Sequence, residues 1–275
     1  MKIPDFVATF ADLQPAARIV EGFAIQRRVI GALMIREAMS RFGHENLGFF
    51  WLMGEPLLLT VGVMVMWTAV GNTHGGAVDV IPFALSSYSL LTLWRHIVGR
   101  SVHAMRQNSS LIFHAHIRFL DILIARALLE TIGVFAAFLI AYAPLALLGR
   151  VPVIHDPLAL CGGWLLGAWF AFGFGLVLAG LTELSEAADR FVAPVMYITL
   201  PLTGAFYMVE WLPTTMHDIV LWSPLVHAFE MFRSGLFPPE YGMKWSAPYI
   251  AVCAFVLTAI GMPLVHYAQT HVEYS

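Results

Sequence analysis

Six stretches of this chain are apolar over lengths that suit helices crossing a lipid bilayer. A hydrocarbon core of about 30 Å requires about 20 helical residues, and unpaired backbone groups are too costly there for irregular segments. Composition agrees, because 59% of the residues are hydrophobic and only 12% are charged. We therefore predict an all-α integral membrane protein with a single transmembrane domain over residues 1–275. The predicted spans are residues 49–70, 80–99, 119–148, 157–181, 192–209 and 246–266.

The segment before the first span, residues 23–42, has a different pattern. Its apolar residues recur near helical spacing, while Arg27, Arg28, Arg36 and Arg41 supply a basic face. This pattern is typical of an amphipathic helix that lies in the membrane interface. An ordinary soluble amphipathic helix is the alternative, and the apolar span that follows at once favours the interfacial helix.

The segment 210–245 is too polar and too rich in proline for a span, yet too apolar for a plain loop. We predict short helices over residues 213–222 and 224–236. Two arrangements stay open. The helices re-enter the membrane from its outer side, where protein or water can satisfy their backbone, or they form an extracytoplasmic loop packed on the surface.

Basic residues are distributed unevenly between the two sides of the predicted spans. Loop 71–79 has no lysine or arginine and loop 149–156 has only Arg150, whereas the N-terminal segment and the loop 100–118 have many. The positive-inside rule then places both termini and the loops 100–118 and 182–191 in the cytoplasm. The basic residues behind this assignment are Lys2, Arg18, Arg27, Arg28, Arg36, Arg41, Arg100, Arg106 and Arg118.

The sequence argues against an enzyme that uses its own nucleotide or metal. Its two lysines, Lys2 and Lys244, do not follow glycine, so the Gly-Lys pair of a phosphate-binding loop is missing. Any ATP that drives the protein must then be bound by another polypeptide. His114 and His116 are poorly spaced as ligands on one helix face, so we predict no metal site, and no catalytic constellation emerges. The net charge of −3 gives no reason to expect nucleic acid.

Several ionisable residues lie in or near the predicted spans, where charge is costly. Glu55, Arg126 and Glu130 are examples, and the last two are four residues apart and suit a structural ion pair on one helix face. Arg36 and Glu37 are explained by snorkelling and local pairing at the membrane surface.

Two further patterns concern helix faces. His227, Glu230 and Arg233 recur at i, i+3 and i+6 on one predicted helical stripe near several aromatic residues. Such a stripe suits either sugar rings with anionic groups or a headgroup-level surface. Gly163 and Gly167 form a GxxxG pair in the fourth predicted span, which favours close helix packing.

Four segments together carry a resemblance to a known family. They are IREAMSRFG at 35–43, LGFFWLMGEP at 47–56, PLTGAFYMVEWLP at 201–213 and SPLVHAFEMFRSGLF at 223–237. With them, nearly the whole chain resembles the KpsM-like permease subunit of ABC-2 type capsular polysaccharide exporters of Gram-negative bacteria. The resemblance implies the ABC-2 exporter fold and a location in the bacterial inner membrane.

The resemblance also implies partners. Permeases of this family form homodimers, and each copy pairs with a separate ATP-binding cassette subunit that carries ATP and Mg²⁺. The implied cargo is a lipid-linked acidic polysaccharide, moved from the cytoplasm outward. The other implied partners are membrane lipids, a periplasmic adaptor and an outer-membrane export protein.

Site residues follow from the same resemblance. It implies a gate at the cytoplasmic entrance, a coupling helix near residues 103–115 that receives the ATPase, and an exit at the short helices 213–236. The implied path and gate residues are Arg36, Glu37, Trp51, Tyr207, Trp211, His227, Glu230 and Arg233. The implied coupling residues are His103, Met105, Arg106, Leu111 and Phe113.

Other functions stay open at this point. A permease for O-antigen or teichoic acid would share the same fold and the same need for an ATPase. A membrane-embedded lipid or glycan transferase would need a clustered acid–base or metal site, which the sequence lacks. A secondary transporter would act without a separate ATPase.

Overall fold

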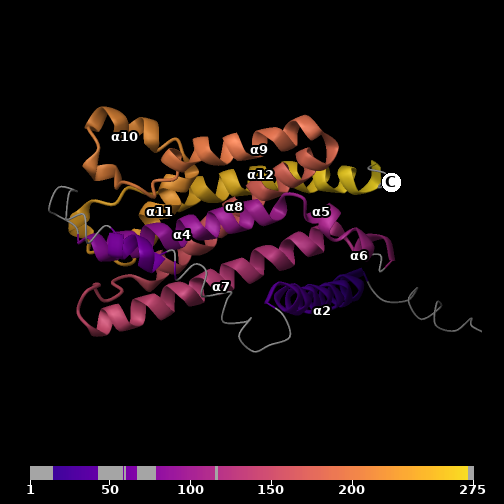
Figure 1. Cartoon of the computed structure of the whole chain (residues 1–275), viewed down its shortest axis with the longest axis horizontal. Helices are drawn as coiled ribbons and strands as arrows, with labels where there is room; N and C mark the ends of the chain where they lie inside the picture. The colour runs from indigo at the N-terminus through magenta and orange to yellow at the C-terminus, as the bar shows by residue number, and fades with distance from the viewer. Residues whose placement is uncertain (1–14, 43–57, 59, 67–78, 115–116, 272–275) are drawn as a thin grey trace, which may run out of the picture.

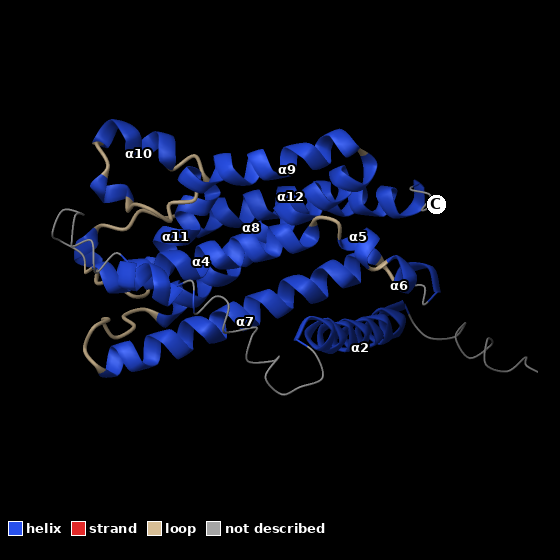
Figure 2. Ribbon diagram, in the orientation of Figure 1, coloured by secondary structure: helices blue, strands red, loops and turns tan. Residues whose placement is uncertain are grey.

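The computed structural model describes residues 15–42, 58, 60–66, 79–114 and 117–271. Among these residues it contains helices joined by turns and no strand (Figure 2). Five of the described long helices run side by side along one axis (Figure 1). They are α4 (Val80–Ser101), α7 (Phe119–Leu147), α8 (Pro157–Leu184), α9 (Glu186–Thr199) and α12 (Ala247–His271). The long helix α2 (Pro15–Phe42) lies across their direction beside α7 (Figure 1). The short helices are α5 (Ala104–Gln107), α6 (Ser109–His114), α10 (Thr214–Val220) and α11 (Pro224–Ser234), with 3-10 turns at Leu200–Leu202, Val209–Trp211 and Pro239–Tyr241.

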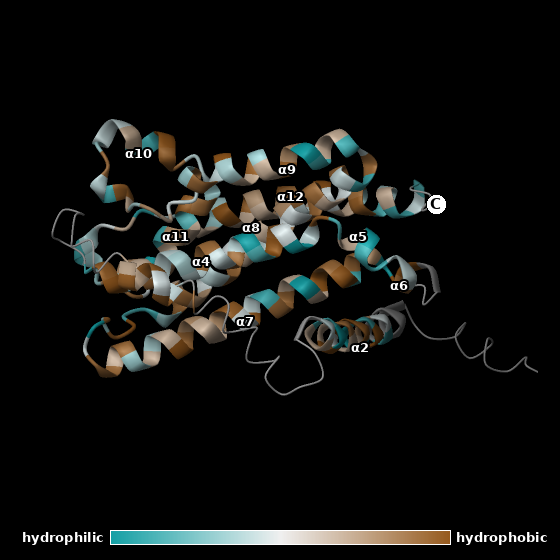
Figure 3. Cartoon of the chain, viewed as in Figure 1, coloured by the Kyte–Doolittle hydropathy of each residue, from teal (hydrophilic) through white to brown (hydrophobic). Residues whose placement is uncertain are grey.

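Three of the described helices, α7, α8 and α12, are long and apolar enough to cross a membrane. Hydrophobic residues run along α7 and α12 in Figure 3. The predicted span 80–99 lies within α4, whose residues are mostly buried against other helices. Most of the predicted span 49–70 lies outside the described residues. The structure is therefore all-α with three apolar candidate spans, and the number of six stays a prediction.

Helix α8 is the centre of the bundle, and glycine lets its neighbours approach. A Cβ at Gly163 would lie 2.4 Å from the backbone nitrogen of Phe232 in α11. A Cβ at Gly261 of α12 would lie 2.5 Å from the Cβ of Leu176 in α8. Such distances leave no room for a side chain, so the GxxxG position at Gly163 packs closely against α11, as small residues in membrane helices commonly do.

Side-chain caps fix the start of α8 and the start of α9, the helix that follows it. Asp156 accepts hydrogen bonds from the backbone N–H groups of Leu158 at 2.9 Å and Ala159 at 3.1 Å, which satisfies donors of the first turn. At the other end a single residue, Ser185, separates α8 from α9, and its Oγ accepts from the N–H of Ala188. The segment 182–191, predicted as a loop, is therefore a helix corner.

Helix α9 differs from the span predicted at 192–209. It begins at Glu186 because Ser185 caps it, and it ends at Thr199, where the chain tightens into a 3-10 turn. Fourteen residues of α-helix rise about 21 Å, less than the hydrocarbon thickness. No residue of α9 is fully buried by the described part of the chain.

The two short helices before α12 have different environments. Helix α11 packs among α4, α8 and α12, and every residue from Leu225 to Arg233 is buried. Helix α10 lies at the outside of the bundle (Figure 1), and no residue of it is buried by the described chain. The predicted helix 213–222 therefore lies on the surface of the described bundle, whereas the predicted helix 224–236 belongs to its core.

Helix α2 begins at Pro15, ahead of the start predicted at residue 23. Leu33 and Glu37 are buried, and the helix packs on α7. Phe23, Ile35 and Met39 are exposed, and Figure 3 shows hydrophilic and hydrophobic residues side by side on this helix. An exposed apolar side next to charged residues is what an interfacial helix requires.

We predict that Gly163→Ala destabilises the protein, because the added methyl group meets the α11 backbone rather than a flexible side chain. Overpacking of this kind costs about 1–3 kcal/mol. The melting temperature of the detergent-purified protein measures the loss. Gly31→Ala is the matched control, since nothing lies within 4 Å of a Cβ at that helical glycine. Equal melting temperatures for the two variants would contradict the close α8–α11 contact.

Candidate functional site

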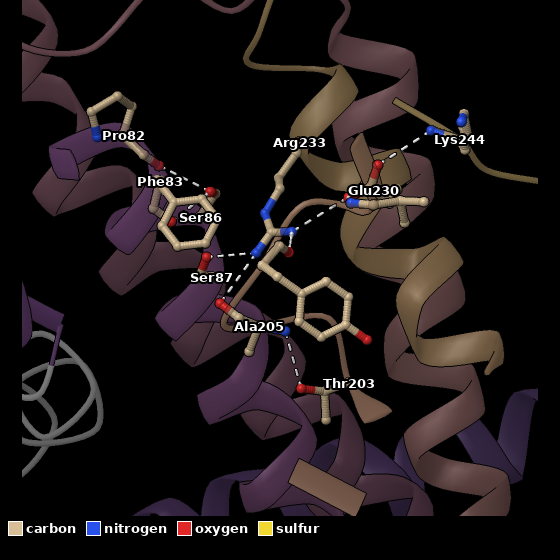
Figure 4. Close-up of polar contacts among 11 residues, drawn as sticks. Pro82, Phe83, Ser86, Ser87, Thr203, Ala205, Glu230, Arg233 and Lys244 are labelled. Carbon is tan, nitrogen blue, oxygen red and sulfur yellow. Dashed lines mark hydrogen bonds and ion pairs between the residues drawn. The ribbon is translucent and has the colours of Figure 1, made fainter. Parts of the chain in front are cut away.

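The first buried polar cluster surrounds Arg233 of α11, whose side chain is fully buried. Its Nη1 donates to the carbonyl oxygen of Tyr207 at 2.8 Å. Its Nη2 donates to Ser87 Oγ at 2.7 Å and to the carbonyl oxygen of Ala205 at 3.3 Å (Figure 4). The guanidinium also lies 4.7 Å from the ring centroid of Phe83. We call Ser87, Tyr207, Glu230 and Arg233 the Arg233 network; it joins α4 and the turn after α9 to α11.

The turn that presents these carbonyls has a local sequence cause. Gly204 has a φ of +80°, a left-handed conformation that favours glycine. Thr203 Oγ1 accepts from the N–H of Ala205 at 3.1 Å (Figure 4). The chain therefore reverses after α9 and turns its backbone oxygens toward Arg233.

Glu230 partners Arg233 one helical turn earlier. Its Oε1 lies 3.5 Å from Arg233 Nη1 and accepts from the N–H of Val209, while its Oε2 accepts from the N–H of Lys244 at 3.2 Å. Burial raises the pKa of Glu230, and the charge of Arg233 opposes that shift. Burial lowers the pKa of Arg233 to about 10, and the Glu230 carboxylate opposes this. The guanidinium therefore keeps its charge at neutral pH.

His227 joins the segment after α10 to the start of α12. Its Nε2 lies 2.8 Å from the carbonyl oxygen of Leu221, and its Nδ1 lies 3.1 Å from the N–H of Ser246. A carbonyl only accepts and an N–H only donates, so the arrangement selects the neutral tautomer with the proton on Nε2. Burial lowers the pKa of His227, and the hydrogen bond to Leu221 opposes the shift.

These residues were expected on the substrate path. In the structure His227, Glu230 and Arg233 contact protein groups and shape one end of the bundle, and their contact with cargo stays a prediction. Tyr207 contributes its carbonyl oxygen to Arg233, and the ring of Trp211 lies 4.8 Å from that of Phe83. Trp51 lies outside the described residues.

The second buried polar cluster links α2, α4 and α7. Arg126 Nε lies 2.9 Å from Glu37 Oε1, and Arg126 Nη1 donates to the carbonyl oxygen of Arg100 at 2.9 Å. Glu130 lies 2.8 Å from Arg100 Nε and 3.0 Å from His96 Nδ1. Arg126 and Glu130 were predicted to pair on one helix face, but these ion pairs run between helices because α2 and α4 both flank α7. We call Glu37, Arg100, Arg126 and Glu130 the interhelix charge cluster.

The predicted coupling segment forms two short helices, α5 and α6, rather than one. His103 has a φ of 58°, and its Nε2 lies 3.2 Å from Asp189 Oδ1. Arg106 Nε lies 3.3 Å from Glu183 Oε2. Met105 is completely buried. The segment is thus fastened to the corner between α8 and α9. Leu111 is partly buried in the core beneath, and the side chain of Phe113 lies outside the described part.

A charged cavity of about 420 Å³ opens beside the interhelix charge cluster. Residues of α2, α4, α5 and α7, with Asn108 just after α5, line it. They are Arg36, Glu37, Ser40, Gly99, Arg100, Gln107, Asn108 and Arg126. The Arg36 side chain is 43% exposed, and its Nη2 hydrogen bonds to Asn108 Oδ1. The structure thus brings the predicted gate residues Arg36 and Glu37 together with arginines from two other helices.

Residues 28–237, which contain both buried clusters and the coupling segment, match the pattern that defines ABC-2 type transporters. The chain belongs to the ABC-2 type transporter family. It is 36% identical over 256 residues to the capsule polysaccharide export inner-membrane protein CtrC of Neisseria meningitidis serogroup B, covering 92% of this chain and 96% of that protein. It is 33% identical over 253 residues to the capsule polysaccharide export inner-membrane protein BexB of Haemophilus influenzae, with coverage of 92% and 96%.

A more distant relative supports the same family. This ABC-2 type transporter chain is 27% identical over 252 residues to the polysialic acid transport protein KpsM of Escherichia coli, covering 88% of this chain and 94% of that protein. The similarities run over nearly the whole length of these relatives. The resemblance inferred from the four sequence segments is confirmed.

Arg233→Gln is expected to destabilise this ABC-2 type transporter chain, because it removes the partner of a buried carboxylate and leaves the carbonyls of Tyr207 and Ala205 without their donor. Breaking a buried ion pair from one side costs about 3–5 kcal/mol. Fluorescence-detected size-exclusion chromatography of samples heated to increasing temperatures measures the loss of stability. The control Arg190→Gln alters an exposed arginine and should melt like the original protein. An Arg233→Gln protein as stable as the control would refute the buried network.

The lowered pKa of His227 predicts the sign of a pH effect. Between the folded pKa and the unfolded value of about 6.5, the unfolded chain binds more protons, so stability rises with pH there. The contribution of His227 is complete above about pH 6.5 and is lost as the pH falls below it. Melting temperatures between pH 8 and pH 5.5 should fall less steeply in His227→Gln. The exposed His155→Gln should keep the original slope, and an unchanged slope in His227→Gln would count against the neutral tautomer.

Proposed function

We propose that this chain is the inner-membrane permease subunit of an ATP-driven exporter of lipid-linked capsular polysaccharide. The observation that carries the proposal is its similarity, over 92% of its length, to proteins named for capsule polysaccharide export. Membership of the ABC-2 type transporter family also supports a function in transport. The described fold agrees with a translocating subunit, because the side chains of its two buried polar clusters hold helices together.

In this proposal the chain crosses the membrane six times with both termini in the cytoplasm, and α2 lies in the cytoplasmic interface. The arginine distribution in the sequence supports this orientation. The coupling segment and the charged cavity then face the cytoplasm. The Arg233 network, α10 and α11 face the periplasm, where the polymer leaves.

ATP and Mg²⁺ are held by a separate cassette subunit that docks on the coupling segment. This segment is well suited to transmit motion, because His103 and Arg106 fasten it to Asp189 and Glu183 at the α8–α9 corner. Helix α4 leads directly into it and carries Ser87 of the Arg233 network near its other end. ATP binding would bias two arrangements of this connected unit, one open to each side.

The proposed exporter is a homodimer with the polymer path between the copies. Support comes from α9, whose Phe191, Tyr197 and Ile198 are exposed on the described chain and suit cover by a second copy or by lipid. A periplasmic adaptor and an outer-membrane protein would receive the polysaccharide.

Deletion of the gene in its host should abolish surface capsule and leave lipid-linked polysaccharide inside the cell. Immunoblotting of whole and lysed cells with a capsule antibody distinguishes the two locations. Complementation with the intact chain should restore export. Normal surface capsule in the deletion strain would overturn the proposed function, and loss of polysaccharide both inside and outside would indicate synthesis rather than export.

Docking of the ATPase on the coupling segment predicts that Ser110→Trp weakens co-purification of the cassette subunit. Ser110 is exposed on α6, so the bulky ring obstructs a partner without entering the core. Thr215→Trp makes the same change on exposed α10 at the opposite end and should not reduce co-purification. Equal recovery of the cassette subunit with both variants would place its docking surface elsewhere.

A further inference from the structure

A cavity of about 720 Å³ opens between the start of α7 and the last turns of α12. The N–H of Phe119 in α7 donates to Gln269 Oε1 of α12 at 3.2 Å, so these two helix ends lie side by side at one end of the bundle (Figure 1). Both helices are candidate membrane spans, and the end of a span lies where hydrocarbon gives way to lipid headgroups. We call this cavity the α7–α12 groove; its lining shares no residue with the charged cavity beside α2.

Arg118 supplies the charge of the groove. It lies just before α7 and is exposed, and its guanidinium has no hydrogen bond or ion pair with any described residue. The lining contains no carboxylate. The first carboxylate along α7, that of Asp121, is buried and accepts a hydrogen bond from Gln26 of α2 at 2.9 Å. The described lining therefore presents one positive charge without a counter-charge, and such a groove attracts an anion.

Two residues of α12 add hydrogen-bond donors beside Arg118. Because the N–H of Phe119 only donates, the Gln269 atom that faces it must be the oxygen, which leaves the side-chain amide nitrogen as a donor. His266 lines the groove one helical turn earlier, and an imidazole N–H is a further donor. The hydroxyl of Thr270 is already used, since it donates to carbonyl groups of its own helix. The polar part of the groove thus combines one charge with two neutral donors.

The rest of the lining is apolar. Leu120 contributes from α7, and Met262, Pro263 and Val265 contribute from α12. Met262 is 41% exposed. It precedes Gln269 by seven residues, which corresponds to about 10 Å along a helix. The apolar part therefore lies deeper within the two candidate spans than the polar part, and the groove changes from polar to apolar in the direction in which a lipid does.

We infer that the α7–α12 groove binds an anionic phospholipid. Its phosphate lies between Arg118 and the side-chain amide nitrogen of Gln269, and an acyl chain follows Leu120 and Met262 toward the centre of the membrane. The phosphate forms charge-assisted hydrogen bonds with the guanidinium, and the chain covers apolar side chains that are otherwise exposed. With the orientation of the proposed function, this lipid belongs to the cytoplasmic leaflet.

The lining distinguishes this lipid from other occupants. A zwitterionic phospholipid brings an ammonium group close to Arg118, where the lining has no carboxylate to receive it. A soluble phosphate would pair with Arg118 but leave Leu120 and Met262 uncovered. A bound lipid also contacts both helices, so it stabilises the folded chain by mass action. Phosphatidylglycerol should therefore raise the melting temperature more than phosphatidylcholine with the same acyl chains.

The test is native mass spectrometry of the full chain, purified in a neutral maltoside detergent, with the melting temperature as a second measurement. The probes are dioleoyl phosphatidylglycerol, dioleoyl phosphatidylcholine and inorganic phosphate. We expect phosphatidylglycerol to be retained well above the other two. Arg118→Gln should reduce its apparent affinity about tenfold, the equivalent of one charge-assisted hydrogen bond lost. Equal retention of the two lipids would exclude headgroup recognition, and phosphate bound as tightly as phosphatidylglycerol would exclude the acyl-chain part.

Arg150→Gln is the matched control, since Arg150 is an exposed arginine just beyond the other end of α7 and outside the groove. It should leave the retention of phosphatidylglycerol and its effect on the melting temperature unchanged. Equal losses in Arg150→Gln and Arg118→Gln would overturn the site in favour of general charge attraction.

Gln269→Glu tests the position of the phosphate without removing the link between the helices. The new carboxylate can still accept from the N–H of Phe119, but it gives Arg118 a counter-charge. Retention of phosphatidylglycerol should fall at least as far as in Arg118→Gln, while the melting temperature without added lipid stays near that of the original protein. Undiminished retention in Gln269→Glu would contradict the phosphate position.

Met262→Ser tests the apolar part without altering charge. It should weaken retention of phosphatidylglycerol and leave phosphate binding unchanged, because only the lipid has a chain to place there. Loss of a dimeric mass in Met262→Ser without any loss of lipid would assign the groove to a second copy of the chain and overturn the lipid site. These measurements do not use capsule export, so they stand or fall separately from the proposed function.

Discussion

A charge placed inside an apolar helical bundle must be balanced by a partner, and this requirement connects the helices of the chain. Arg233 is fully buried and takes its partners from α4, from the turn after α9 and from Glu230 of its own helix. Arg126 takes Glu37 from α2. Removing either partner alone would leave an uncompensated charge, which is far more costly than never having the pair. Apolar surfaces alone would permit many arrangements of these helices. The buried polar residues favour the arrangement in which their charges are paired.

Helix α4 holds both buried clusters in one rigid element. Ser87 binds Arg233 near the start of the helix, and Arg100 binds Glu130 near its end. About 20 Å of helix separates these residues at a rise of 1.5 Å each. His103 and Arg106 follow directly and fasten the next segment to the α8–α9 corner. A shift at the coupling segment can therefore reach the opposite end of the bundle through one element.

The sequence predicted the helical class, the long apolar helices and the close packing at Gly163, because length, hydropathy and residue size are local properties. It did not predict the partners of Arg126 and Glu130 on other helices, since their four-residue spacing favours a pair on one helix, while the tertiary fold brings Glu37 of α2 and Arg100 of α4 to them. Ser87 and His96 were also missed as cluster members. The sequence could have indicated them, because polar residues inside a predicted span such as 80–99 usually face a polar partner.

The buried position of Arg233 has a consequence for biosynthesis. An arginine at membrane depth opposes insertion by about 3 kcal/mol, so α11 has little tendency to enter a bilayer as an independent segment. Its stabilising contacts come from α4 and α8, which are made earlier, and from Lys244 and Ser246 beside α12, which are made later. The contacts of Glu230 and His227 in α11 are therefore complete only after the ribosome has made the segment that carries Lys244 and Ser246.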